Sequence, residues 1–186
     1  MLTEFRRTLA SLAAGIVLGA GLASTPALAD GPVLVTVSGA VANANRGPID
    51  AEVDKLFEFT DVTFEQAHEF DLDALNALPQ VRIRADFPLG GRIIEFEGPT
   101  LADVLAAAGA EGETVTIQAI DGYAVDVPMT EMMEKGAVVA LKRDGKPLGI
   151  GGFGPTQIVF PRAEREDLAE MPDDWWIWSI YHIRVE

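Results

Sequence analysis

Residues 97–127 read E-G-P-T-L-A-D-V-L-A-A-A-G-A-E-G-E-T-V-T-I-Q-A-I-D-G-Y-A-V-D-V and decide the expected fold. The first half predicts a short amphipathic helix, with apolar residues at the i, i+3, i+4 and i+7 positions: Leu101, Val104, Leu105 and Ala108. Thr100 stands at the N-cap position, and Asp103 can reach back to it as in a capping box. Gly109 follows where a left-handed C-cap residue is usual.

The second half predicts a β-hairpin. Val115, Ile117 and Ala119 alternate with polar residues, as expected for a strand with one buried face. Asp121-Gly122 is a turn sequence, and apolar residues then alternate through 123–127. The whole stretch is therefore interpreted as a helix packed against a hairpin.

The rest of the chain supports an α+β fold, a single strand-rich mixed domain with about three short helices. Further helices are expected at 71–78 and 128–136, and a short strand is preferred to a helix at 56–60, while 62–70 fits either. Further strands are expected at 33–38, 81–84, 93–97, 137–141, 156–160 and, as one long final strand, 175–185. A charged loop is expected at 162–174.

The N-terminus has the pattern of a secretory signal peptide. Arg6 and Arg7 precede an apolar run, and Ala27-Leu28-Ala29 supplies small residues for cleavage before Asp30. We expect residues 1–29 to be removed and residues 30–186 to form a periplasmic or secreted domain with no membrane insertion. The arginine pair weakly resembles a twin-arginine signal, so the export route stays open.

Charge and cysteine content exclude several classes of function. The chain carries 14 basic and 29 acidic residues, a net charge of −15, which argues against nucleic acid as a partner. It has no cysteine, so it has no disulfide, thiol catalysis, iron–sulfur cluster or thiolate-bound metal.

The histidines and serines predict neither a metal site nor a catalytic triad. His68 and His182 lie far apart, and no pair has the spacing of a zinc motif. After residue 29 the only serines are Ser38 and Ser179, and neither stands in a G-x-S-x-G sequence. We therefore assign no catalytic and no metal-binding residue.

Five segments in order resemble the oxidoreductase molybdopterin-binding domain of the sulfite oxidase family, over roughly residues 33–185. They read E-F-E-G-P-T-L-A-D-V-L-A-A-A-G-A, A-I-D-G-Y-A-V-D-V-P, A-L-K-R-D-G-K-P-L, G-P-T-Q-I-V-F-P and W-I-W-S-I-Y-H-I-R-V. The resemblance is strongest to short, exported, stand-alone members. It implies the fold of that domain.

Three departures bear on the cofactor that the resemblance implies. The family's enzymes hold molybdenum through a pterin dithiolene and one cysteine, and the matching region, 81–88, has none. Phe153 stands where the enzymes commonly have a histidine, and residues 162–174, which match a basic phosphate-holding loop, are mostly acidic. Carboxylates in that loop would repel the phosphate dianion of the cofactor. Together with the missing cysteine and the missing histidine, this points away from cofactor binding.

Two hypotheses follow. The first is a cofactor-free module that binds a small ligand, an anion among the options, or a partner protein such as a membrane sensor or redox subunit. The second is a molybdopterin-dependent oxidoreductase without a cysteine ligand, so enzymatic activity stays open. The ligand site is expected at a crevice formed by the following residues: Asp121, Tyr123, Lys142, Arg143, Gly152, Phe153, Gly154, Trp176 and Trp178.

Overall fold

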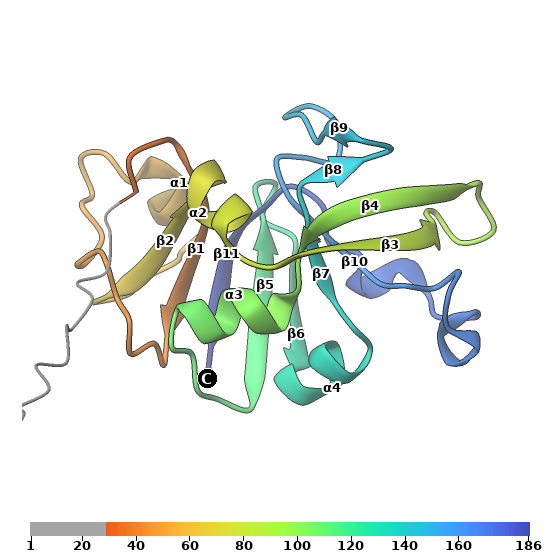
Figure 1. The fold of residues 1–186 in the computed structure, drawn as a ribbon. Coiled ribbons are helices and arrows are strands. Elements are labelled where there is room, and N and C mark those ends of the chain that lie inside the picture. Colours follow the sequence, from red (N-terminus) through yellow and green to blue (C-terminus); the bar gives the residue numbers. More distant parts are fainter. Residues whose placement is uncertain (1–28) are drawn as a thin grey trace, which may run out of the picture.

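The computed structural model describes residues 29–186 (Figure 1). Its largest sheet has five strands in the order β2-β1-β11-β5-β6, in which β1 and β11 run parallel and the other neighbours antiparallel. A four-stranded sheet has the order β3-β4-β8-β9, and β7 pairs with β10. The strands are β1 Val33–Gly39, β2 Ala67–Asp71, β3 Gln80–Asp86, β4 Ile93–Pro99, β5 Thr114–Ala119, β6 Ala124–Pro128, β7 Val138–Ala140, β8 Lys142–Arg143, β9 Lys146–Pro147, β10 Gln157–Val159 and β11 Ile180–Val185.

Four α-helices and two 3-10 helices connect the strands of the described region. They are α1 Lys55–Phe59, α2 Leu72–Ala77, α3 Leu101–Ala107, α4 Met129–Glu134, η1 Glu166–Leu168 and η2 Asp173–Trp175. The expected α+β, strand-rich single domain is confirmed, with four short helices in place of about three. No helix within residues 29–186 has the length and apolar character needed to cross a membrane.

The helix and hairpin expected at 97–127 form as α3, β5 and β6. The Thr100 hydroxyl accepts a hydrogen bond from the Asp103 N–H at 3.0 Å and donates one to the Asp103 carboxylate at 2.5 Å. Gly109 has the left-handed φ of +61°. In the hairpin, Val115 lies opposite Val127 and Ile117 opposite Val125.

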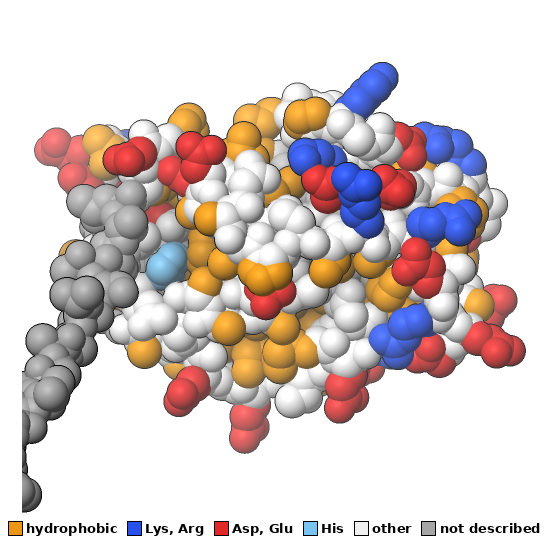
Figure 2. All heavy atoms as spheres, in the orientation of Figure 1, with side chains coloured by type: hydrophobic (Ala, Val, Ile, Leu, Met, Phe, Trp, Pro, Cys, Tyr) orange, Lys and Arg blue, Asp and Glu red, His pale blue; other side chains and the backbone are white. Residues whose placement is uncertain are grey.

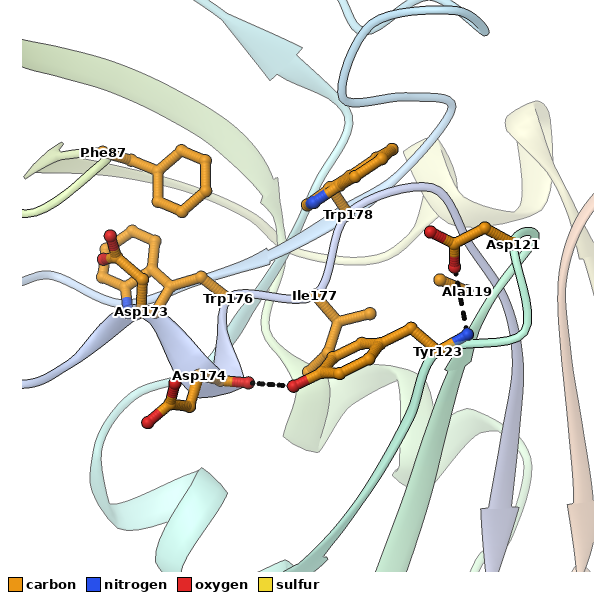
Figure 3. Close-up of a pocket in the computed structure, with 9 residues that line it drawn as sticks. All are labelled: Phe87, Ala119, Asp121, Tyr123, Asp173, Asp174, Trp176, Ile177 and Trp178. Atoms are coloured by element: carbon orange, nitrogen blue, oxygen red, sulfur yellow. Dashed lines mark hydrogen bonds between the residues drawn. The ribbon is translucent and has the colours of Figure 1, made fainter.

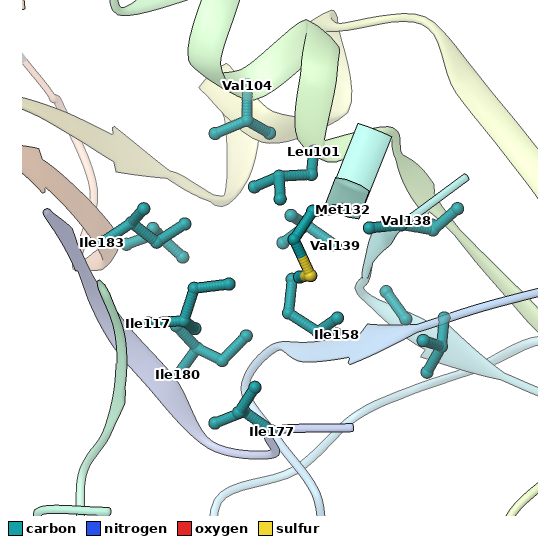
Figure 4. Packing of buried hydrophobic residues seen from close by; sticks show 14 of the residues in the cluster. Leu101, Val104, Ile117, Met132, Val138, Val139, Ile158, Ile177, Ile180 and Ile183 are labelled. Carbon is teal, nitrogen blue, oxygen red and sulfur yellow. The ribbon is translucent and has the colours of Figure 1, made fainter. Parts of the chain in front are cut away.

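One apolar core joins α3 to the five-stranded sheet. Figure 4 shows Leu101 and Val104 of α3 pointing toward Ile117 of β5 and Ile183 of β11. All four side chains are fully buried. Each such side chain contributes about 1.5–3 kcal/mol to folding by its burial.

Gly98 allows β4 to approach β7 closely. A Cβ atom at this position would lie 2.0 Å from the Val139 carbonyl oxygen and 2.9 Å from the Ala140 Cα. A glycine is therefore required just before the helix for the two sheets to meet there.

One expected element is wrong, and the structure decides one segment for which the sequence allowed two alternatives. Residues 55–59 form α1, where a strand was preferred, because only Phe57 is buried and Phe59 stays 85% exposed; the helix turns Phe57 inward alone. The segment 62–70, left open, contributes β2.

The expected final strand at 175–185 is shortened to β11 by an irregular segment. Ser179 has a left-handed φ of +55°, and its N–H donates to the Phe153 carbonyl at 3.0 Å. The side-chain alternation is lost before it, because Trp176 and Ile177 are both buried while Trp178 is exposed. The predicted signal peptide lies outside the described residues except for Ala29.

Candidate functional site

An open pocket of about 400 Å³ lies where the end of β3, the β5–β6 turn and the segment before β11 meet. Figure 3 shows its walls, which combine aromatic rings with carboxylates. The lining residues are Phe87, Ala119, Asp121, Tyr123, Asp173, Asp174, Trp176, Ile177 and Trp178. The volume is in the range that takes a small molecule.

Trp176 forms a rigid platform on one side of the pocket. The side chain is only 2% exposed. Phe87 stacks on it with ring centroids 5.4 Å apart and planes at 10°, and the Arg162 guanidinium lies 4.3 Å from its centroid. The three groups form a layered stack in which Arg162 gains a cation–π contact.

Arg162 fixes the acidic loop against the end of β3. Its buried guanidinium donates to the Asp86 carboxylate at 2.7 Å and to the Asp86 carbonyl oxygen. It also donates to the Met171 carbonyl at 2.6 Å and to the Asp173 carboxylate at 2.8 Å. Burial acts to raise the pKa of Asp86, but the hydrogen bonds from Arg162 and from the Gly90 N–H, together with the positive charge of Arg162, outweigh it, so the pKa is lowered.

Two rings stand at the open side of the pocket. Tyr123 is 51% and Trp178 43% exposed. The Tyr123 hydroxyl donates to the Asp174 carbonyl oxygen at 3.3 Å, while the Tyr123 N–H donates to the Asp121 carboxylate at 3.0 Å. Trp178 packs edge-to-face against Phe153, with centroids 6.2 Å apart. Both rings are therefore held in place before any ligand arrives.

Four of the site residues predicted from the sequence line this pocket: Asp121, Tyr123, Trp176 and Trp178. A fifth, Phe153, lies behind its wall in edge-to-face contact with Phe87 at 5.4 Å. These five residues come from three segments, 121–123, 153 and 176–178, which the fold brings together.

Lys142 and Arg143 are not part of the pocket lining. Lys142 pairs with the Glu97 carboxylate at 2.5 Å, and this bond, followed by that from Arg82, lowers the pKa of Glu97. Arg143 lies 5.0 Å from the centroid of the Phe153 ring, on the side of the four-stranded sheet. Figure 2 shows Lys and Arg side chains gathered over this part of the surface.

Gly152 and Gly154 do not line the pocket either. Both donate their N–H groups to the Gly149 carbonyl oxygen, at 3.1 and 3.2 Å. A Cβ atom on Gly154 would lie 2.4 Å from the Leu148 carbonyl carbon, so the glycine serves close backbone packing. The loop thus directs these two N–H groups inward and not toward an anion.

Sequence reasoning missed Phe87, Asp173, Asp174 and Arg162. Asp173 and Asp174 lie in the segment expected to be a charged loop, and Phe87 follows the strand expected at 81–84. Arg162 pairs with Asp86 across a sequence separation of 76 residues. Only the excess of acidic residues next to three tryptophans was visible as a signal in the sequence.

A buried pair of side chains, Ser38 and His182, lies outside the pocket. Their Oγ and Nε2 atoms are 2.8 Å apart, and Phe57 and Phe64 pack around the imidazole. Burial, with a smaller contribution from Arg184, lowers the pKa of His182 to about 4. Within residues 29–186 no group of three or more His, Asp or Glu side chains could hold a metal ion.

The pocket offers ring faces and carboxylates to a ligand. Asp173 is neutralised by Arg162, whereas the lining contains no Lys, Arg or His beside Asp121 and Asp174. Such a surface binds by apolar contact and by attraction of positive charge.

Comparisons with known proteins agree on the fold. The crystal structure of the sulfane dehydrogenase SoxCD from Paracoccus pantotrophus is similar, with a TM-score of 0.54 and 15% sequence identity; the match covers 81% of this chain and 37% of that one. No curated protein matches in sequence. Residues 48–164, more than half of the chain, match the family model of the oxidoreductase molybdopterin-binding domain. The protein therefore belongs to the oxidoreductase molybdopterin-binding domain family.

Proposed function

We propose that this protein is an exported, cofactor-free binding module that keeps the family fold and takes a small ligand in the aromatic pocket. The observation that carries the proposal is the chemistry of the pocket wall. Residues from 81–88 and 162–174, the segments that the sequence resemblance relates to the family's cofactor site, contribute Phe87, Asp173 and Asp174 to it. They supply a ring and carboxylates in place of a thiolate and basic groups.

The residues present do not fit the family's cofactor. The chain has no cysteine to bind molybdenum, and by the sequence resemblance Phe153 stands where the family's enzymes commonly have a histidine. A phosphate placed in the pocket would meet three carboxylates and only the Arg162 guanidinium, which is already bonded to two aspartates. Repulsion between like charges in a partly buried site disfavours that arrangement.

Metal analysis tests the cofactor-free part of the proposal. The full-length protein is expressed in its native host, purified from the exported fraction and measured for molybdenum. We expect none in a strain that makes the cofactor, whereas stoichiometric molybdenum would support the alternative of a molybdopterin-dependent oxidoreductase without a cysteine ligand.

The export part of the proposal rests on the pattern of residues 1–29. N-terminal sequencing of the same purified protein should begin at Asp30. A mature chain that begins at Met1 would contradict export with cleavage. Binding to a membrane sensor or redox subunit stays a prediction. Cross-linking in the same cell fraction would test it.

Ligand binding itself is tested by mass spectrometry of small molecules released when the natively purified protein is denatured. We expect a compound that is absent from a Trp178→Ala variant, because Trp178 is exposed and contributes to the pocket without supporting the core. A Trp178→Ala variant that releases the same amount of the same compound would place the ligand elsewhere.

A further inference from the structure

The pocket has two carboxylates whose charge no basic group in its lining offsets. Asp173 is bonded to Arg162 and also accepts from the Leu89 N–H at 2.9 Å. Asp121 accepts only the Tyr123 N–H, and both Asp121 and Asp174 are exposed. Figure 3 shows them at opposite ends of Tyr123.

The aromatic residues divide into a support and a contact surface. Trp176 is covered by Phe87, which stacks on it, and by the Arg162 guanidinium, so it supports the wall. Tyr123 and Trp178 are the pocket rings with large exposed area, and Figure 3 shows Tyr123 running between Asp121 and Asp174. Rings of this kind attract cations over their faces, by about 0.5–1 kcal/mol when exposed and about 2 kcal/mol when water is excluded.

We propose that the ligand of this pocket is a small organic cation that carries an alkylated or quaternary ammonium group. This inference rests on the proposed ligand-binding function and names its ligand class. The positive charge would lie near Tyr123 and Trp178, with Asp121 and Asp174 as the counter-charges, and the alkyl part would contact Phe87 and Ile177.

Other ligand classes fit the same walls less well. A bare metal ion needs several oxygen ligands around one point, and no such cluster exists among residues 29–186. An anion would face the carboxylates, and a neutral apolar molecule would leave two charges without a partner beside it. An organic cation uses both the rings and the carboxylates.

The test compares a cation with its neutral isostere. The mature full-length protein is titrated with choline, with tetramethylammonium and with 3,3-dimethyl-1-butanol, in which carbon replaces the charged nitrogen of choline. Binding is followed by tryptophan fluorescence and by calorimetry. We expect saturable binding of both cations, and binding of the alcohol weaker by about tenfold or more.

Variants connect the preference for charge to the carboxylates. Asp121→Asn and Asp174→Asn should each weaken choline binding severalfold without changing the affinity for the alcohol, because only the charge is removed. Asn keeps the acceptor that Asp121 offers to the Tyr123 N–H. Glu166→Gln, an exposed change in the same acidic loop but outside the pocket lining, is the control and should have no effect.

The results separate this inference from the proposed function. Equal affinity for choline and the alcohol, no saturable binding of either cation, or tighter binding of inorganic phosphate than of choline would overturn the inference. If the natively purified protein releases a neutral or anionic compound that is lost in Trp178→Ala, the inference fails and the binding function stands. Stoichiometric molybdenum in that preparation would instead overturn the proposed function.

Discussion

The two segments that matter most, 97–127 and 162–178, are stabilised in different ways. In the first, α3 and the β5–β6 hairpin combine regular backbone hydrogen bonds with a buried apolar face. In the second, an irregular loop with two 3-10 helices depends on Arg162, which joins it to β3 and to Trp176. Many small contributions hold the fold segment, whereas one side chain organises the site segment.

The largest effect expected from this difference is that of Arg162→Met. The change keeps an unbranched apolar stem but removes the guanidinium, so the carboxylates of Asp86 and Asp173 lose their buried partner. Breaking a buried ion pair from one side costs about 3–5 kcal/mol. Urea denaturation should show a loss of unfolding free energy of that size, and any ligand binding in the pocket should be lost with it.

Arg165→Met is the matched control for this prediction. Arg165 is in the same loop and pairs with Asp167 at 2.5 Å, but the pair is at the surface. Exposed ion pairs contribute about 0–1 kcal/mol. Equal destabilisation by the two variants would show that Arg162 has no special role in the site segment.

The difference between local and long-range contacts also explains which elements could be predicted from the sequence. Thr100, Gly109 and the Asp121-Gly122 turn act on their immediate neighbours, so their effect on the fold segment follows from local rules. The strand preferred at 56–60 is wrong because Phe57 and Phe59 alternate as in a strand while Leu56 and Phe57 also fit a helical face. The burial of Phe57 against His182 and Tyr181, with Phe59 exposed, decides between the two patterns. The prediction of one long final strand over 175–185 is wrong because nothing in the sequence predicts the left-handed φ of Ser179.

Part of the site could be predicted from the sequence, and the part that depends on long-range pairing could not. Trp178 and Tyr123 belong to segments whose residue types predict binding, and both line the pocket. Arg162 could not be assigned, because its partner Asp86 is 76 residues away and the pairing depends on how β3 meets the loop. Lys142 and Arg143 were predicted from charge alone, and charge does not reveal that Lys142 is paired with Glu97.

Acid should remove the contributions of His182 and Asp86 to the unfolding free energy in different pH ranges. His182, in β11 beside Gln118 of β5, has its pKa lowered from 6.5 to about 4 by burial, so the unfolded chain binds a proton more readily. Its contribution is fully present above pH 6.5 and is lost as the pH falls from 6.5 to about 4, by about 3 kcal/mol at most. The pKa of Asp86 is lowered from 3.8, so its contribution to the unfolding free energy is present above pH 3.8 and is lost only as the pH falls below that value.

Unfolding free energies measured in urea between pH 7 and 4 check this prediction. His182→Gln keeps a group that can bond to Ser38 and should flatten the pH dependence in that range. His68→Gln, a change at a partly exposed histidine, should leave the slope as it is. A slope unchanged in His182→Gln would assign the pH dependence to other groups.

The smallest expected effect is that of Thr100→Ala in the fold segment. The substitution removes the hydroxyl that accepts the Asp103 N–H at the start of α3. Loss of an N-cap side chain costs about 1 kcal/mol, and the buried Leu101 and Val104 remain in place to hold the helix. Urea denaturation should therefore show a small loss of stability and an unchanged affinity for any ligand of the pocket.

Two further variants make this prediction specific to the cap. Thr100→Ser keeps an acceptor at the same position and should restore most of the lost stability. Thr130→Ala, at an exposed position inside α4, removes a threonine that caps nothing and should be neutral or slightly stabilising, because alanine has the higher helix propensity. If Thr100→Ala were as damaging as Arg162→Met, the fold segment would also depend on a single side chain, and the distinction between the two segments would be wrong.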